Sequence, residues 1–151
     1  MIEPLRHPIF KHIMDVVDDM GLEAYVIGGY VRDYYLHRSS TDIDVVVVGS
    51  GVAVAEELGR RLGAKVTIFK TYGTAMLRWR DTEIEFVGAR RESYTPESRN
   101  PHVEPGTLED DQLRRDFTIN ALAWSLNKGS FGELVDPFGG LDDLDDCIIR
   151  T

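Results

Sequence analysis

The chain has 151 residues, of which 42% are hydrophobic and 28% are charged, so its size and composition are those of one globular domain. No apolar stretch approaches the ~20 residues of a membrane-spanning helix, the N-terminus lacks the pattern of a secretory signal, and the single cysteine, Cys147, excludes an intrachain disulfide. The formal net charge of −9 argues against a stand-alone nucleic-acid binder, which draws its affinity from a basic surface. We therefore expect a cytoplasmic protein without a membrane segment.

The first half of the chain alternates segments with helical and strand-like patterns. Apolar residues recur at helical spacing up to Met20, and Gly21 follows as a C-terminal stop. The β-branched run at 43–48 is typical of a strand that is covered on both faces. The helices expected here span 9–20, 30–36 and 52–62, and the strands span 24–27 and 43–48.

The second half predicts further strands, a long loop and one helix. The segment 90–106 is polar, contains three prolines and has no periodicity, so we interpret it as a loop long enough to have a function. The abrupt end at 148–151 suggests a division between domains. The expected strands span 66–69, 75–79, 83–87 and 133–135, and the expected helix spans 115–126. This mixture predicts an α/β or α+β domain built on a sheet.

A glycine pair, Gly28-Gly29, separates the first expected strand from the helix that follows. Glycines at such a turn let the backbone approach a ligand, and the N–H groups of the next helix attract phosphate. Arg32 projects from the first helical turn, where a guanidinium can pair with phosphate oxygens. The alternative is that the glycines only make a turn and that Arg32 is a surface charge.

Asp42 and Asp44 stand two residues apart at the start of an expected strand. Residues with this spacing point to the same face, so both carboxylates project to one place. Like charges that close repel each other unless a cation lies between them, and Mg²⁺ prefers oxygen ligands, commonly carboxylates together with substrate phosphates. The pattern therefore indicates a magnesium site, with two solvated acids as the alternative.

A third acid, Glu85, shares a strand face with Glu83. A neighbouring strand can bring Glu85 beside Asp42 and Asp44 and complete a cluster of three carboxylates. The alternative is a pair of exposed acids on a half-buried hairpin.

Arg114 and Arg115 begin the helix expected over 115–126. Asp116 and Asn120 are one helical turn apart and share a face, so they can hydrogen-bond a ribose while Arg115 binds a triphosphate. The alternative is that Asp116 caps the helix and Asn120 is solvated. We expect the four histidines at surface or loop positions and both tryptophans in the core, all without a catalytic role.

Four stretches of the sequence follow one another in a specific order. They are VIGGYVRD at 26–33, TDID at 41–44, LRRDFTINA at 113–121 and LVDPFGGLDDL at 134–144. Together they resemble the class II tRNA nucleotidyltransferase and bacterial poly(A) polymerase family, within the polymerase-beta-like superfamily. The first stretch is unspecific by itself and RRDFTINA is highly specific. The resemblance spans nearly the whole chain and implies a nucleotidyltransferase domain with a mixed central sheet flanked by helices.

The resemblance implies a role for each residue at a matching position. The implied catalytic carboxylates are Asp42 and Asp44 as metal ligands, with Glu85 as the third. The implied nucleotide contacts are Gly29 and Arg32 at the triphosphate, Arg115 at the nucleotide, and Asp116 and Asn120 near the ribose. The segment 136–144 resembles the connection from head to neck, and 90–106 falls where the family has a flexible catalytic loop.

The implied activity is template-independent transfer of a nucleotide from ATP or CTP to an RNA 3′-hydroxyl with Mg²⁺. The family's neck, body and tail, which select the base and grip tRNA, have no counterpart up to Thr151. The head motifs serve both CCA addition to tRNA and poly(A) addition, so both remain open. Two other hypotheses also remain: a magnesium–nucleotide-binding module that cannot turn over alone, and a structural domain with an inert site.

Overall fold

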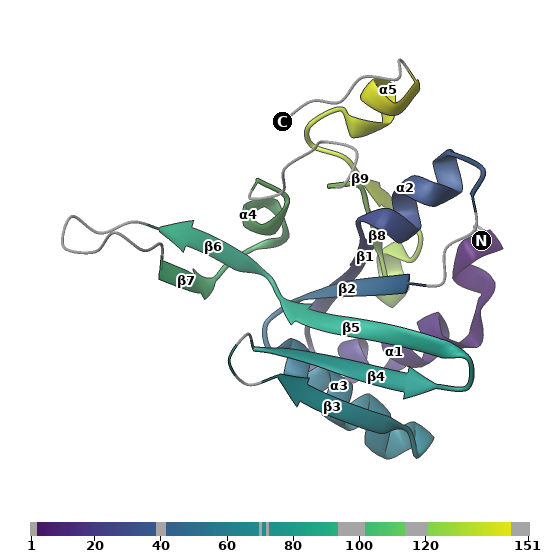
Figure 1. Ribbon diagram of the computed structural model, residues 1–151, viewed down its shortest axis with the longest axis vertical. Coiled ribbons are helices and arrows are strands. Elements are labelled where there is room, and N and C mark those ends of the chain that lie inside the picture. Colours follow the sequence, from purple (N-terminus) through teal and green to yellow (C-terminus); the bar gives the residue numbers. More distant parts are fainter. Residues whose placement is uncertain are drawn as a thin grey trace.

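The computed structural model describes residues 3–38, 42–69, 71, 73–93, 102–113 and 121–145. In this part of the chain a seven-stranded sheet has the order β3-β4-β5-β2-β1-β8-β9. Its strands are β1 (Glu23–Ile27), β2 (Asp42–Val48), β3 (Lys65–Phe69), β4 (Thr74–Trp79), β5 (Thr82–Gly88), β8 (Ala123–Ser125) and β9 (Leu134–Val135). Neighbouring strands are antiparallel except for the parallel pair of β2 and β5 at the centre (Figure 1).

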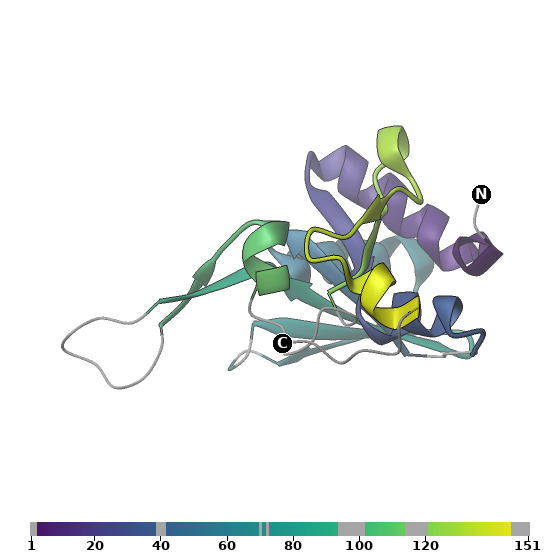
Figure 2. The same cartoon turned by 90° about the horizontal axis from the view of Figure 1, so that it is seen from above.

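Helices and a two-stranded ribbon accompany this sheet. The helices are α1 (Pro8–Met20), α2 (Gly29–Tyr35), α3 (Gly51–Leu62), α4 (Leu108–Leu113) and α5 (Gly140–Asp145), with short 3-10 turns η1 (Glu3–Arg6) and η3 (Lys128–Ser130). The ribbon pairs β6 (Arg90–Ser93) with β7 (His102–Pro105). Seen from above, the ribbon extends away from the main sheet (Figure 2). No helix in the described ranges has both the length and the apolar character that crossing a membrane requires.

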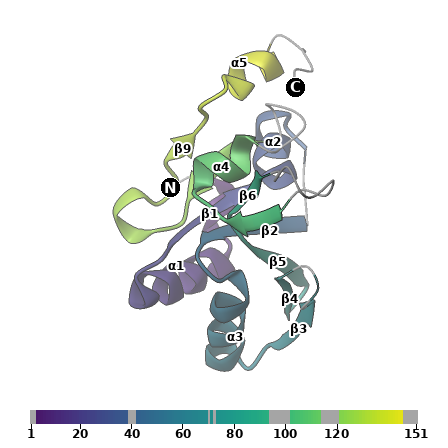
Figure 3. The ribbon, with the colours of Figure 1, turned by 90° about the vertical axis from the view of Figure 1, so that its left-hand side faces the viewer.

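The main core lies between the sheet and the helices α1 and α3. The two helices lie together on one side of the strands (Figure 3). Both end at a glycine in the left-handed conformation, Gly21 with φ 68° and Gly63 with φ 62°, as the sequence suggested for Gly21. Alternate residues of β2, namely Ile43, Val45 and Val47, are buried in this core. The other face of β2 is therefore turned away from α1 and α3.

A smaller apolar cluster covers part of that other face. It contains Val46 of β2, together with Ile27, Ala89, Leu108 and Ala123. The middle of β2 is therefore buried on both faces, as its β-branched run predicted. The start of the strand, at Asp42 and Asp44, is more open, because Asp42 is exposed and Asp44 is half-buried.

Two predictions about secondary structure were wrong. The helix expected over 115–126 does not extend through Ala123–Ser125, which forms β8 beside β1; the part at 114–120 lies outside the described residues. All of 121–126 is buried, and a fully buried, mostly apolar segment fits an inner strand as well as a buried helix. The loop expected over 90–106 contains the ribbon strands β6 and β7 at its two ends.

The remaining predicted elements are confirmed, with each bound within one residue. The short helices α4 and α5 were not predicted, because six residues are too few to show a helical period. The start of α5 has a local cause: the carboxylate of Asp136 accepts hydrogen bonds from the N–H groups of Gly140 (2.7 Å) and Leu141 (3.0 Å). Trp124 is fully buried as expected, whereas Trp79 is only partly buried beside the core.

Candidate active site

Four carboxylate side chains gather where the parallel strands β2 and β5 begin. The register pairs Asp42 with Glu83 and Asp44 with Glu85. Because paired residues of neighbouring strands point to the same face, all four acids project from the same side of the sheet. With Ile43 and Met76 they line an open hollow of about 200 Å³. The sequence-based prediction that a neighbouring strand brings Glu85 beside Asp42 and Asp44 is confirmed.

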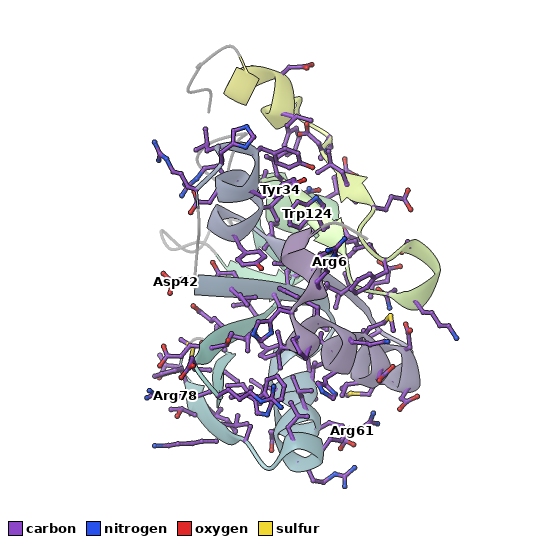
Figure 4. All side chains as sticks on the ribbon, turned by 90° about the vertical axis from the view of Figure 1, so that its right-hand side faces the viewer. Arg6, Tyr34, Asp42, Arg61, Arg78 and Trp124 are labelled. Carbon is purple, nitrogen blue, oxygen red and sulfur yellow. The ribbon has the colours of Figure 1, made fainter. Side chains whose placement is uncertain are left out.

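The alternation of residues along the two strands fixes the direction of these acids. Ile43 on β2 and Ile84 and Phe86 on β5 are buried in the main core with at most 4% of their surface exposed. Residues that alternate with buried apolar side chains must point to the opposite face. In Figure 4, Asp42 lies on the side of the sheet opposite α1.

The glycine pair lies directly beside this carboxylate cluster. Ile27, the last residue of β1, is in register with Asp44, so Gly28 and Gly29 follow immediately next to the start of β2. Gly28 has φ 82° and ψ −135°, a conformation that only glycine adopts without strain, and it precedes α2. Its N–H donates to the carbonyl oxygen of Leu122 at 3.2 Å. Gly28 therefore shapes the turn through its backbone conformation, and its N–H group already donates a hydrogen bond to Leu122.

Arg32 lies on α2, which packs against β2. Its guanidinium forms an ion pair with Asp33, with Nε and Nη2 each 3.1 Å from Oδ1. The Arg32 side chain is 31% exposed and that of Asp33 is 16% exposed. The guanidinium is thus held in place while part of its surface stays accessible to an anion.

The donor set of the hollow fits a hard cation such as Mg²⁺. The four acidic side chains offer only oxygen ligands, which Mg²⁺ prefers. In the described ranges no group of three His, Cys, Asp or Glu side chains is arranged so that it could hold a metal ion. A site with only one or two carboxylates remains compatible with Mg²⁺, which completes its coordination shell with water and substrate phosphates.

Three predicted site residues, Arg115, Asp116 and Asn120, fall in 114–120 and lie outside the described residues. The residues on either side of this segment are placed. Gln112 is buried, and its Nε2 donates to the carbonyl oxygens of Ala121 (2.8 Å) and Val135 (3.1 Å). Leu122 follows directly and accepts the hydrogen bond from Gly28. The residue that directly follows the RRDFTINA stretch therefore contacts the glycine turn.

Two residues that line the hollow, Glu83 and Met76, were not predicted as site residues. Glu83 carried a usable signal, because it alternates with Glu85 on the same strand face. Met76 carried none, since its position depends on the antiparallel pairing of β4 with β5, which sets Met76 opposite Glu85.

The comparison with protein families agrees with this geometry. The family model of the poly A polymerase head domain matches residues 24–150, which include the four acids of the hollow and the glycine turn. The chain belongs to the poly A polymerase head domain family. Within it, this head domain is 48% identical over 130 residues to the A-adding tRNA nucleotidyltransferase of Aquifex aeolicus (strain VF5), covering 86% of the chain and 16% of that protein.

Two further relatives support the assignment. The CCA-adding enzyme of Bacillus velezensis (strain DSM 23117 / BGSC 10A6 / LMG 26770 / FZB42) is 36% identical over 146 residues, covering 95% of this chain and 34% of that enzyme. A solved tRNA nucleotidyltransferase in complex with a primer tRNA and an incoming ATP analog superposes with a TM-score of 0.81 at 44% identity, covering 92% of the head domain and 38% of that chain. The head domain thus spans well under half the length of each of these proteins.

Proposed function

We propose that the full-length protein transfers a nucleotide from ATP or CTP to the 3′-hydroxyl of a tRNA in the cytoplasm. The observation that carries this proposal is the register of β2 with β5, which sets Asp42 and Asp44 beside Glu83 and Glu85 next to the glycine turn. The relatives support tRNA as the acceptor, since they are named A-adding and CCA-adding enzymes.

In this proposal Asp42 and Asp44 hold Mg²⁺, and Glu85 is the third catalytic carboxylate. When bound there, the metal would stabilise negative charge on the attacking oxygen and on the departing pyrophosphate. The half-buried position of Asp44 supports its role, because electrostatic interactions strengthen where water is partly excluded.

The incoming triphosphate lies along the glycine turn. Gly29, at the start of α2, allows its phosphates to approach the backbone, and Arg32 pairs with a phosphate oxygen. Arg32 then divides its donors between Asp33 and the phosphate, since a guanidinium carries five N–H groups. On the basis of the family motif, we assign the contact with the nucleotide to Arg115 and the contacts with its ribose to Asp116 and Asn120.

The transfer is a single displacement at the α-phosphorus of the nucleotide. The 3′-oxygen of the RNA forms a bond to the α-phosphorus of the nucleotide, and the bond from that phosphorus to the bridging oxygen of the β-phosphate breaks. Pyrophosphate leaves with the electron pair. The proton of the 3′-hydroxyl passes to a carboxylate beside it, for which Glu85 is our candidate because it lies opposite Asp44.

Incubation of the full-length protein with a tRNA that lacks its CCA end, Mg²⁺ and labelled ATP or CTP tests this function. We expect incorporation at the 3′ end, release of pyrophosphate, and loss of both when EDTA removes the metal. An Asp42→Ala/Asp44→Ala double variant should incorporate nothing. Absence of incorporation by the folded wild-type protein, or full incorporation by the double variant, contradicts the proposal.

A further inference from the structure

The outer strands β3 and β4 continue the face that carries the acids. On β3, Val66 packs toward the main core, so Lys65, Thr67 and Phe69 point to the opposite side. On β4, Met76 lines the hollow with the acids, and Arg78 lies two residues further on the same face. Figure 4 shows Asp42 and Arg78 on the same side of the sheet.

Phe69 is an aromatic residue on this otherwise polar stretch of surface. It is 45% exposed, the largest value among the exposed large hydrophobic residues of the described chain. An aromatic ring on an open sheet face is a stacking surface for an unpaired nucleic-acid base. The neighbouring Ile68 is 38% exposed, but alternation turns it to the other side of the strand.

Two cations lie directly opposite each other on the same face. The register of β3 with β4 pairs Lys65 with Arg78, and like charges in this position are destabilising by themselves. In the part of the chain that the structure covers, neither side chain forms an ion pair. In a domain with a formal net charge of −9, this concentration of positive charge suits an anionic ligand such as a phosphate backbone.

The platform formed by Lys65, Thr67, Phe69 and Arg78 adjoins the carboxylate hollow. Arg78 is in register with Glu83, and Thr67 is in register with Met76, which lines the hollow. Strands are spaced about 4.8 Å apart, so β3 lies roughly 14 Å from β2 and its metal-ligand candidates. A few unpaired nucleotides span that distance.

We infer that the open face of β3 and β4 binds the unpaired 3′ end of the acceptor RNA: Phe69 stacks on a base, while Lys65 and Arg78 hold the phosphates upstream of the reacting hydroxyl. This inference rests on the proposed function and adds to it the path of the acceptor strand. Thr67, between the cations and the ring, offers a hydroxyl to a ribose 2′-OH.

The first test compares two apolar residues on the same strand. Binding of a fluorescent primer tRNA to the full-length protein is measured by anisotropy without nucleotide, so that turnover is not needed. Phe69→Ala should weaken binding about tenfold, the usual loss for one stacked base, and Phe69→Tyr should restore it. Ile68→Ala, with its side chain on the opposite face, is the matched control and should bind RNA like the wild type.

The second test measures the dependence of RNA affinity on salt. A cation that contacts a single-stranded phosphate contributes about 0.7 to the slope of log affinity against log salt concentration. The Lys65→Gln/Arg78→Gln double variant should therefore lower the slope by about 1.4. Lys11→Gln/Lys128→Gln removes the same charge from exposed positions elsewhere and should leave the slope unchanged.

These measurements separate failure of the inference from failure of the proposed function. Equal RNA affinities for Phe69→Ala and Ile68→Ala, or an unchanged salt slope for the Lys65/Arg78 variant, overturn the inference even if nucleotide is added normally. If the wild type sediments as a dimer and Phe69→Ala as a monomer, with RNA affinity unchanged, that result would also overturn the inference by identifying a protein interface. Absence of incorporation in the wild type bears only on the proposed function.

Discussion

Asp44 on β2 and Glu85 on β5 lie directly opposite each other in the one parallel strand pair of the described sheet. Their neighbours Asp42 and Glu83 repeat the relationship two residues earlier. Carboxylates at this spacing repel one another, and the repulsion is relieved when a cation binds between them. The arrangement is thus suited to binding a divalent ion in the folded state.

Replacing Asp44 with Asn should reduce nucleotide incorporation at least about 100-fold, because it removes a charged ligand where charge develops in the transition state. Glu83→Gln at the rim of the same hollow is the matched control and should have a smaller effect. Initial rates at saturating Mg²⁺ and nucleotide measure both, with thermal unfolding to verify the fold. Equal losses in the two variants would contradict the assignment of Asp44 as a ligand.

The two glycines of the turn should respond differently to alanine. Gly28→Ala forces a side chain into a conformation with φ 82°, which should lower the free energy of unfolding by about 1–3 kcal/mol. At Gly29 an added Cβ meets the Arg32 guanidinium at ordinary contact distances, with Nη2 at 3.5 Å and Cζ at 4.0 Å, so the fold should tolerate it. Gly29→Ala should instead raise the KM for nucleotide, since phosphate must approach that backbone.

Urea unfolding and steady-state kinetics of both glycine variants check this contrast. A stable Gly28→Ala variant, or a Gly29→Ala variant with the wild-type KM, would count against the proposed use of the turn.

His7 should make stability depend on pH. Its Nδ1 accepts a hydrogen bond from the N–H of Ile9 (3.2 Å) and so caps α1, and its Nε2 lies 3.2 Å from the hydroxyl of Thr82. Burial, and secondarily the charge of Arg80, lower the pKa of His7 below its usual 6.5. The unfolded chain therefore takes up the proton first as the pH falls, so this contribution to stability is complete above about 6.5 and declines toward the folded-state pKa.

The loss of stability between pH 7.5 and 5.5 should be smaller in His7→Ser, which retains a capping oxygen but does not titrate. Chemical unfolding at the two pH values measures the difference. An equal pH-dependent loss in both proteins would show that His7 is not responsible.

Asn127 should be important for stability although it lies far from the four acids of the hollow. Its Oδ1 accepts from the N–H of Ala24 (3.0 Å), and its Nδ2 donates to the carbonyl of Leu22 (2.7 Å) and to Asp18 (3.0 Å). Asn127→Ala leaves these groups without their partner and should cost about 1–3 kcal/mol in the free energy of unfolding. Lys128→Ala, an exposed neighbour, should have almost no effect in the same unfolding experiment.

The sequence was informative wherever a local pattern determines the structure. The β-branched run at 43–48 and the alternation at 83–87 predicted both strands, and the two-residue spacing of the acids predicted that those on one strand share a face. The parallel pairing of β2 with β5 was not predictable from local patterns, because it joins residues about forty positions apart, as the register of Asp44 with Glu85 shows. The error at Ala123–Ser125 has the same origin, since pairing with β1 decides between strand and helix for a wholly buried segment.

The position of the divalent cation decides whether Asp42 and Asp44 form the metal site. Crystals of the full-length protein grown with Mn²⁺ in place of Mg²⁺ and a non-hydrolysable ATP analogue would locate the metal by anomalous scattering. We expect a metal peak within about 2.3 Å of a carboxylate oxygen of both Asp42 and Asp44, bridged to the nucleotide phosphates beside Gly29. Metal and nucleotide bound without contact to either aspartate would contradict it.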